Sequence, residues 1–156
     1  NGYRGIFFVD VDGSAITGNF IGTDASGAMD VSGTAVNLNQ SGIVLSTGSD
    51  GNVIGGTTAA ARNVISGNNH FGVEFQFGSQ NNRLEGNFIG ATVTGLSALG
   101  NLSGGVSYWS AGSGNVTGGG AAGAGNVISG NGGMGGTFFH AAMLGRPRLR
   151  KAPKCA

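Results

Sequence analysis

The sequence predicts an all-β fold, namely a right-handed three-sided parallel β-helix (a solenoid) of about four coils with an irregular C-terminal tail. Three observations predict it: internal motifs recur at near-constant offsets, short Val, Ile and Phe runs alternate with polar residues, and glycine and asparagine punctuate these runs. Glycine alone supplies 34 of the 156 residues. Both residue types suit a chain that turns often, because they adopt positive φ angles at little steric cost.

The internal repeats carry the most weight, since a fixed period is the signature of a repeat architecture. The motif NVISGN at 63–68 recurs 63 residues later, and GNVIG at 51–55 recurs as GNVTG at the same offset. The motif GNFIG at 18–22 recurs 68 residues later. Two offsets with different motifs predict two alternating types of coil. Parallel pairing at about 4.8 Å per rung would make four coils roughly 20 Å tall.

Each coil divides into three short strands. The first strand begins at a glycine in every coil, and alternation of side chains predicts two inward columns: Ile6, Ile43, Val73 and Val106, then Phe8, Leu45, Phe75 and Tyr108. The second strands are expected at 14–16, 52–54, 82–84 and 115–117, and the third at 19–21, 63–65, 87–89 and 126–128. Long excursions are expected after the third strand in coils one and three, and before it in coils two and four.

One asparagine column stands at the start of the third strands. Asparagines stacked on successive rungs can bond amide to amide along the stack. An asparagine there could instead be an ordinary turn residue in the left-handed conformation. The sequence favours a structural asparagine ladder, formed by Asn19, Asn63, Asn87 and Asn126.

The repeat pattern divides the chain into a β-helix at 1–131 and an irregular basic tail at 132–156. Within the tail, Phe138 and Phe139 could begin one more strand, but the remainder lacks coil periodicity. A foreign or frame-shifted extension is favoured over a natural cap. Because the chain starts in mid-pattern, we expect it to be a fragment of a longer protein. Uncapped coil ends would leave open sheet edges, so association into a homo-oligomer is an open alternative.

Three segments carry a family resemblance: NVIGGTTAAARNVISGN at 52–68, NRLEGNFIGA at 82–91 and GNVTGGGAAGAGNVISGN at 114–131. They resemble large bacterial secreted right-handed parallel β-helix repeat proteins, which share the coil architecture of pectate lyases. The resemblance implies an extracellular or cell-surface location. It implies little about activity, because such repeats occur mostly in long surface proteins. Pectate-lyase-like enzymes work on a face lined with carboxylates, often with calcium.

Charge and composition exclude several function classes. Residues 1–145 carry three arginines against seven acidic residues, a net charge of −4, which is a poor match for a nucleic-acid partner. No apolar run is long enough for a membrane span. The one cysteine, Cys155, excludes an intrachain disulfide, and two histidines with one cysteine cannot build a standard zinc site. We therefore expect no metal and no cofactor, with calcium as the one ion to consider.

Three carboxylates are the candidates for catalysis. Asp12 and Asp50 fall at equivalent turn positions of adjacent coils, where two carboxylates could share a cation or divide acid and base roles. Aspartate is also simply a good turn residue, which is the reading we favour. The third carboxylate is Glu74, at an outward position of a first strand. Carboxylates on neighbouring rungs could supply the separation of about 5–9.5 Å that glycoside hydrolysis requires.

The outward columns of the first strands form the second candidate surface: Phe7, Val44, Glu74 and Ser107, then Val9, Ser46, Gln76 and Trp109. Trp109 beside Glu74 and Gln76 would offer a sugar an apolar ring face with polar partners. Exposed Phe7, Val9 and Val44 would fit a protein contact equally well. His70, in the link between coils two and three, could bind substrate or act as a base if a carboxylate lies close. A turn histidine is more often structural or solvated.

The sequence leaves three function classes open. The favoured class is a noncatalytic extracellular scaffold or glycan-contact module whose partner is a polysaccharide. The second is a polysaccharide lyase or glycoside hydrolase that uses Asp12, Asp50 or Glu74. The third is another hydrolytic activity, such as ester cleavage, at an oligomer interface or in the tail. Whether the protein is an enzyme is not decided by the sequence.

Overall fold

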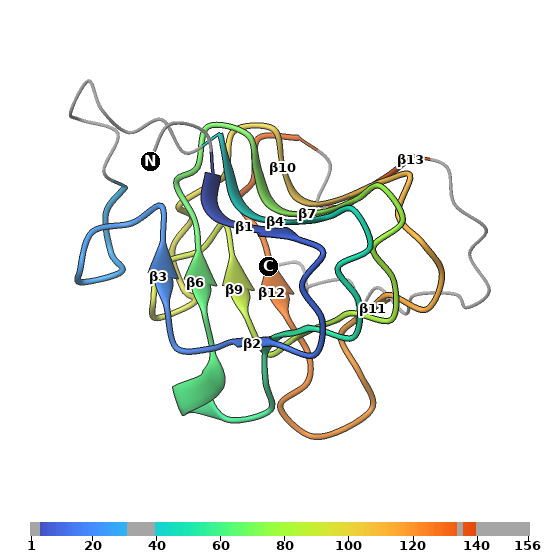
Figure 1. The fold of residues 1–156 in the computed structure, drawn as a ribbon. Coiled ribbons are helices and arrows are strands. Elements are labelled where there is room, and N and C mark those ends of the chain that lie inside the picture. The colour runs from blue at the N-terminus through green and yellow to red at the C-terminus, as the bar shows by residue number, and fades with distance from the viewer. Residues whose placement is uncertain (1–3, 31–39, 134–135, 140–156) are drawn as a thin grey trace.

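The fold is a right-handed three-sided parallel β-helix of about four coils, as predicted. The computed structural model describes residues 4–30, 40–133 and 136–139. In Figure 1 the first coil faces the viewer, and the chain runs clockwise as the coils recede. Three parallel sheets form the sides, and each sheet takes one strand from every coil. The described residues contain no α-helix, only the short 3-10 helix η1 (Ala59–Ala61).

The first sheet has the longest strands and sets the predicted inward columns in register. Ile6 pairs with Ile43, and Leu45 pairs with Phe75, as the alignment of coils required. A fifth strand, which includes Phe138 and Phe139, pairs with β10 and extends the sheet past residue 131. The strand order is β1 (Arg4–Val9), β4 (Ser41–Ser46), β7 (Phe71–Gln76), β10 (Gly104–Trp109) and β13 (Gly136–Phe139).

The second and third sheets are built from strands of two or three residues. Such short strands are stable here because each pairs with the same segment of the next coil. The second sheet contains β2 (Ala15–Ile16), β5 (Val53–Gly55), β8 (Arg83–Glu85) and β11 (Val116–Thr117). The third contains β3 (Phe20–Ile21), β6 (Val64–Ile65), β9 (Phe88–Ile89) and β12 (Val127–Ile128).

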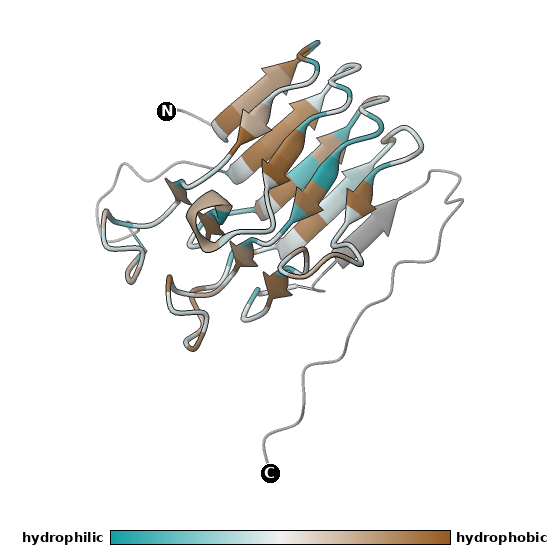
Figure 2. Ribbon diagram, turned by 90° about the horizontal axis from the view of Figure 1, so that it is seen from below, coloured by the Kyte–Doolittle hydropathy of each residue, from teal (hydrophilic) through white to brown (hydrophobic). Residues whose placement is uncertain are grey.

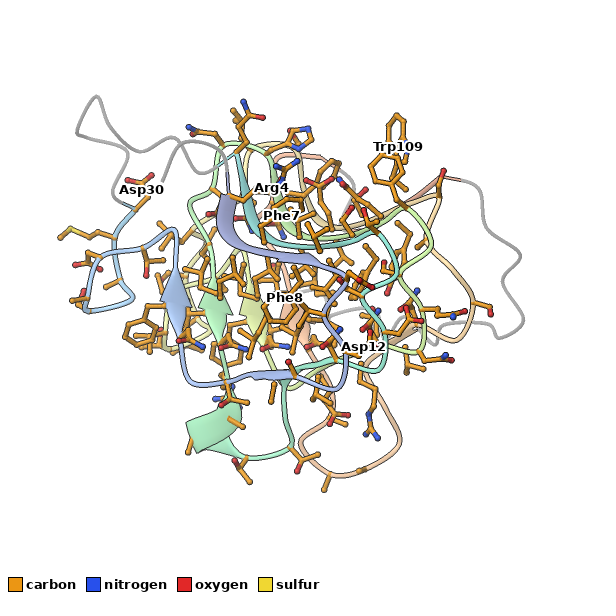
Figure 3. All side chains as sticks on the ribbon, in the orientation of Figure 1. Arg4, Phe7, Phe8, Asp12, Asp30 and Trp109 are labelled. Carbon is orange, nitrogen blue, oxygen red and sulfur yellow. The ribbon has the colours of Figure 1, made fainter. Side chains whose placement is uncertain are left out.

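The core is a column of aliphatic and aromatic side chains inside the solenoid, one layer per coil. Ile54, Ile65, Leu84 and Ile89 from the two short-stranded sheets are fully buried. The rings of Phe75 and Tyr108 stack with their centroids 4.9 Å apart. Figure 2 shows apolar colour along most strands, and Figure 3 shows Phe8 inside the solenoid while Phe7 lies on the opposite side of β1.

The glycine near the start of the first strand has a steric cause in coils two and three. A Cβ atom on Gly42 would lie 2.6 Å from the carbonyl oxygen of Gly72 and 2.7 Å from Cγ2 of Ile65. A Cβ on Gly72 would meet Ile89 and the carbonyl of Gly105 at similar distances. At this corner the backbones of successive coils pass too close for any side chain. In these two coils the glycine is therefore required by coil-to-coil packing.

The predicted asparagine ladder is present, with the backbone N–H and side-chain amide of each member donating to Oδ1 of the next. Two further ladders were not predicted. One precedes the second sheet and contains Asn52, Asn82 and Asn115; the other precedes the first sheet and contains Asn68, Asn101 and Asn131. All three corners of the solenoid thus carry an asparagine ladder. The buried amides also donate to backbone carbonyls, as Asn63 does to Ile16.

The excursions after the third strand also stack. The turn at 23–30 closes by an antiparallel bridge between Thr23 and Asp30, and its counterpart closes between Ala91 and Ala98. The backbone N–H of Val93 donates to the carbonyl of Gly27, so the loop of the third coil packs on the loop of the first coil. The repeat therefore extends from the solenoid into its loops.

Candidate functional site

The candidate site is the outer face of the first sheet, formed by the two outward columns. Its exposed apolar side chains lie at the two ends of the stack of coils. Phe7 and Val9 in the first coil are 47% and 46% exposed, and Trp109 in the fourth is 54% exposed. The prediction that Val44 is exposed is wrong, because it is fully buried between its register neighbours Phe7 and Glu74.

A polar cluster occupies the centre of this face, around the carboxylate of Glu74. Although it points outward, Glu74 is only 6% exposed. The Ser41 hydroxyl donates to its Oε1, and the Gln76 amide donates to its Oε2 at 2.7 Å. Nδ1 of His70 lies 3.4 Å from the same Oε1. The burial of this charge is therefore offset by several polar partners.

His70 has the carboxylate neighbour that a base would need, and its side chain is about half exposed. The three groups do not form a nucleophilic triad, however. In a triad the imidazole stands between serine and carboxylate and uses a different nitrogen for each. Here Ser41 bonds to Glu74 directly, and Nδ1 of His70 faces both. Ser41 is also buried, so its oxygen is a poor nucleophile for a polymeric substrate.

Gln76 links the polar cluster to Trp109. The two residues are register partners on β7 and β10, so their side chains are neighbours on the outer face. Figure 3 shows Trp109 projecting away from the solenoid above the first sheet. The structure thus brings together four of the predicted site residues, namely Glu74, Gln76, His70 and Trp109.

Sequence reasoning missed an aromatic residue beside this group. Phe77 directly follows β7, is 58% exposed, and donates its backbone N–H to the carbonyl of Trp109. Its φ of +44° is in the left-handed region, which a bulky residue seldom adopts. The alignment of coils contained a signal for Phe77, because the equivalent turn position in the other three coils holds a polar residue. These residues are Asp10, Thr47 and Ser110.

Asp12 and Asp50 lie apart from this face, in the turn between the first and second sheets. Oδ1 of Asp12 accepts the backbone N–H of Asp50, and Oδ1 of Asp50 accepts that of Gln80. Each aspartate therefore ties its turn to the turn of the next coil. Figure 3 places Asp12 at this turn, well below Trp109. The geometry gives both residues a structural role.

Calcium does not fit the residues present. In the described part of the chain, no three His, Cys, Asp or Glu side chains gather where they could hold a metal ion. Calcium prefers six to eight oxygen ligands, with several carboxylates among them. Glu85, the other glutamate of the chain, forms an ion pair with Arg83 at 2.8 Å on the second sheet.

Charge is unevenly placed along the edges of the first sheet. Because its strands are parallel, all their beginnings lie along one edge and all their ends along the other. Arg4, whose guanidinium packs 4.2 Å from the Phe7 ring centroid, and His70 lie at the beginnings. Asp10 directly follows β1, on the edge that carries Phe77 and Trp109, whereas Asp12 and Asp50 lie further on, in the turn toward the second sheet.

Comparison with known proteins adds no identification: no family model, curated protein or solved structure matches the chain. The class of protein is therefore defined by the fold and the site alone: it is a parallel β-solenoid whose first sheet has aromatic and polar side chains on its outer face. Within the described residues, no helix is long and apolar enough to cross a membrane.

Proposed function

We propose that this chain is a noncatalytic glycan-contact module of an extracellular β-helix repeat protein, and that a polysaccharide binds on the outer face of its first sheet. The observation that carries the proposal is the exposed indole of Trp109 beside the side chain of Gln76. Sugar rings have apolar C–H faces that pack on aromatic rings and hydroxyl groups that need hydrogen-bond partners. Trp109 supplies the first, and Gln76 and His70 supply the second.

The rigidity of this face supports binding. Glu74 holds Gln76 through a 2.7 Å hydrogen bond, and the backbone beneath it belongs to a five-stranded sheet. A side chain that is already ordered loses less conformational entropy when a ligand binds. The proposed extracellular location and bacterial origin rest on the resemblance of the repeats and on the nature of the ligand.

Affinity electrophoresis through gels that contain single soluble polysaccharides tests the proposal. The wild-type protein is expected to be retarded by at least one polymer, and Trp109→Ala is expected to restore free migration. Asp12→Asn is the matched control, because Asp12 lies in the turn and off this face. Free migration of the wild type in every gel would refute the proposal.

A hydrolytic function is the second candidate, favoured by the contact between His70 and Glu74. A carboxylate at Nδ1 leaves Nε2 of a neutral imidazole as the basic nitrogen, able to accept a proton from water. In this hydrolytic function, Glu74 and His70 would be the catalytic residues. Release of reducing ends or of 235-nm-absorbing unsaturated products that disappears in His70→Gln would replace the binding proposal with this one.

A further inference from the structure

We infer that Phe77 is a second aromatic residue of the glycan site, and that the aromatic pair Phe77 and Trp109 selects a neutral β-linked glycan over an anionic one. The inference rests on the proposed function and extends it to one further residue and one class of ligand. Both residues stand at the strand-end edge of the first sheet, on adjacent rungs.

Phe77 is anomalous in two independent ways. A φ of +44° is costly for a residue with a Cβ and a ring, and the turn would fold better with Gly, Asn or Asp. Its ring is also 58% exposed, so burial does not offset that cost. All four coils have a positive φ at this position, so the turn itself requires the conformation, and Phe77 differs by placing an exposed aromatic residue where the other coils hold Asp10, Thr47 and Ser110. That exposed aromatic side chain is available for a contact outside the chain.

The pair has the geometry for successive sugar units. Adjacent rungs of a parallel sheet lie about 4.8 Å apart. Trp109 is in register with Gln76, so Phe77 lies one rung away and one residue further along its strand. Two aromatic residues offset in this way suit a flat chain whose hydroxyl groups are equatorial, such as a β-linked glucan or xylan. The carbonyl of Trp109 accepts the N–H of Phe77, which fixes the two backbones relative to each other.

The surrounding charges disfavour an acidic polymer. Gln76, the register partner of Trp109, and Ser110, which follows Trp109, are neutral. Asp10 follows β1 on the same edge in the first coil, whereas Arg4 and His70 lie at the opposite edge. A uronate chain that follows the edge would meet the like charge of Asp10, which reduces affinity most at low salt.

Titration of the intrinsic fluorescence tests the inference, because Trp109 is the single tryptophan of the chain. The probes are hydroxyethylcellulose, as the neutral polymer, and polygalacturonate. The variant Phe77→Asn replaces the ring with a residue that accepts positive φ. It is expected to bind hydroxyethylcellulose about three- to tenfold more weakly, the range of one aromatic contact, and to melt about 2–4 °C higher. Thr47→Asn is the matched control at the equivalent position, expected to raise the melting temperature without changing affinity.

The outcomes separate the two proposals. If the wild type binds and Phe77→Asn binds equally well, Phe77 is not part of the site, while the glycan proposal stands. If polygalacturonate binds as tightly as hydroxyethylcellulose, the preference for a neutral glycan is wrong. If neither polymer nor any other in the panel alters the emission of Trp109, the proposed function fails and this inference fails with it.

Discussion

The backbone N–H and the side-chain amide of Asn63 both donate to Oδ1 of Asn87, at 3.2 and 2.9 Å. The same pair of bonds joins Asn19 to Asn63 and Asn87 to Asn126. A buried amide with all its groups satisfied fixes the register of each coil on the next, because a shifted coil would leave several polar atoms unpaired. The ladders therefore specify the solenoid as much as the apolar core does.

The first prediction concerns the centre of a ladder. Asn63→Ala is expected to lower the free energy of unfolding by about 2–4 kcal/mol, since it removes the buried hydrogen bond to the carbonyl of Ile16 and both bonds that Asn19 donates to Asn63. Asn19→Ala, at the exposed end of the same ladder, is expected to cost about 1 kcal/mol or less. Urea denaturation measures both. Equal losses of unfolding free energy in the two variants would show that stability does not depend on the position of an asparagine in the ladder.

The second prediction concerns the corner glycine. Gly42→Ala is expected to destabilise the fold by about 2–3 kcal/mol, because the new Cβ would overlap the backbone of the next coil. Gly125→Ala is the control, since a Cβ there meets no atom within 4 Å and its φ is not positive. The control is expected to be neutral or slightly stabilising. A stable Gly42→Ala protein would contradict the packing explanation.

The third prediction follows from Tyr108. Burial raises the pKa of its phenol above 10.0, and the hydrogen bond with Thr117 opposes this rise. A raised pKa in the folded state means that the folded protein binds more protons than the unfolded protein above pH 10. Stability should therefore fall as the pH rises past 10. Absorbance at 295 nm should show one of the two tyrosines titrating late, and Tyr108→Phe should remove that late step.

The fourth prediction separates structural from catalytic aspartates. The double variant Asp12→Asn/Asp50→Asn keeps an acceptor oxygen for the backbone N–H groups of Asp50 and Gln80. It is expected to lose about 1 kcal/mol or less and to bind polysaccharide normally. If the wild type releases reducing ends and this variant does not, the two aspartates are catalytic and the structural assignment is wrong.

The fifth prediction concerns association. Strands β1, β2 and β3 are each the last in their sheet, so the first described coil presents three strand edges. We expect the mass measured by sedimentation to rise with concentration through pairing of these edges. Ala15→Lys, on the exposed edge strand β2, should suppress the rise. A concentration-independent mass for both proteins would exclude this mode of association.

The fold could be predicted from the sequence because every coil repeats the same short-range pattern. Aligning the glycine-led first strands placed Ile43 against Val73 and Leu45 against Phe75, which is the observed register. The same alignment contained Asn52, Asn82 and Asn115 in one column, yet only the ladder before the third sheet was predicted. The ladder through Asn101 was harder to find, because Asn68 and Asn131 follow their third strands closely in the repeated motif NVISGN, whereas the loop 90–100 separates Asn101 from β9.

The site was predicted less completely, since exposure depends on neighbours that alternation does not describe. Val44 and Glu74 point outward as expected, but side chains on both flanking rungs bury them. The contact of Glu74 with Ser41 depends on which way Ser41 turns at the strand start, which the alternation pattern does not give. Phe77 was overlooked because the turn position after a strand is normally read for its backbone conformation alone.

The fluorescence of Trp109 during titration with a panel of neutral and acidic polysaccharides shows directly whether this face binds a glycan. A neutral β-linked polymer is expected to cause a saturable blue shift of the emission, with reduced quenching by acrylamide. Asp12→Asn is expected to behave like the wild type. An emission spectrum and quenching constant that stay unchanged with every polymer would contradict the assignment of this face to glycan binding.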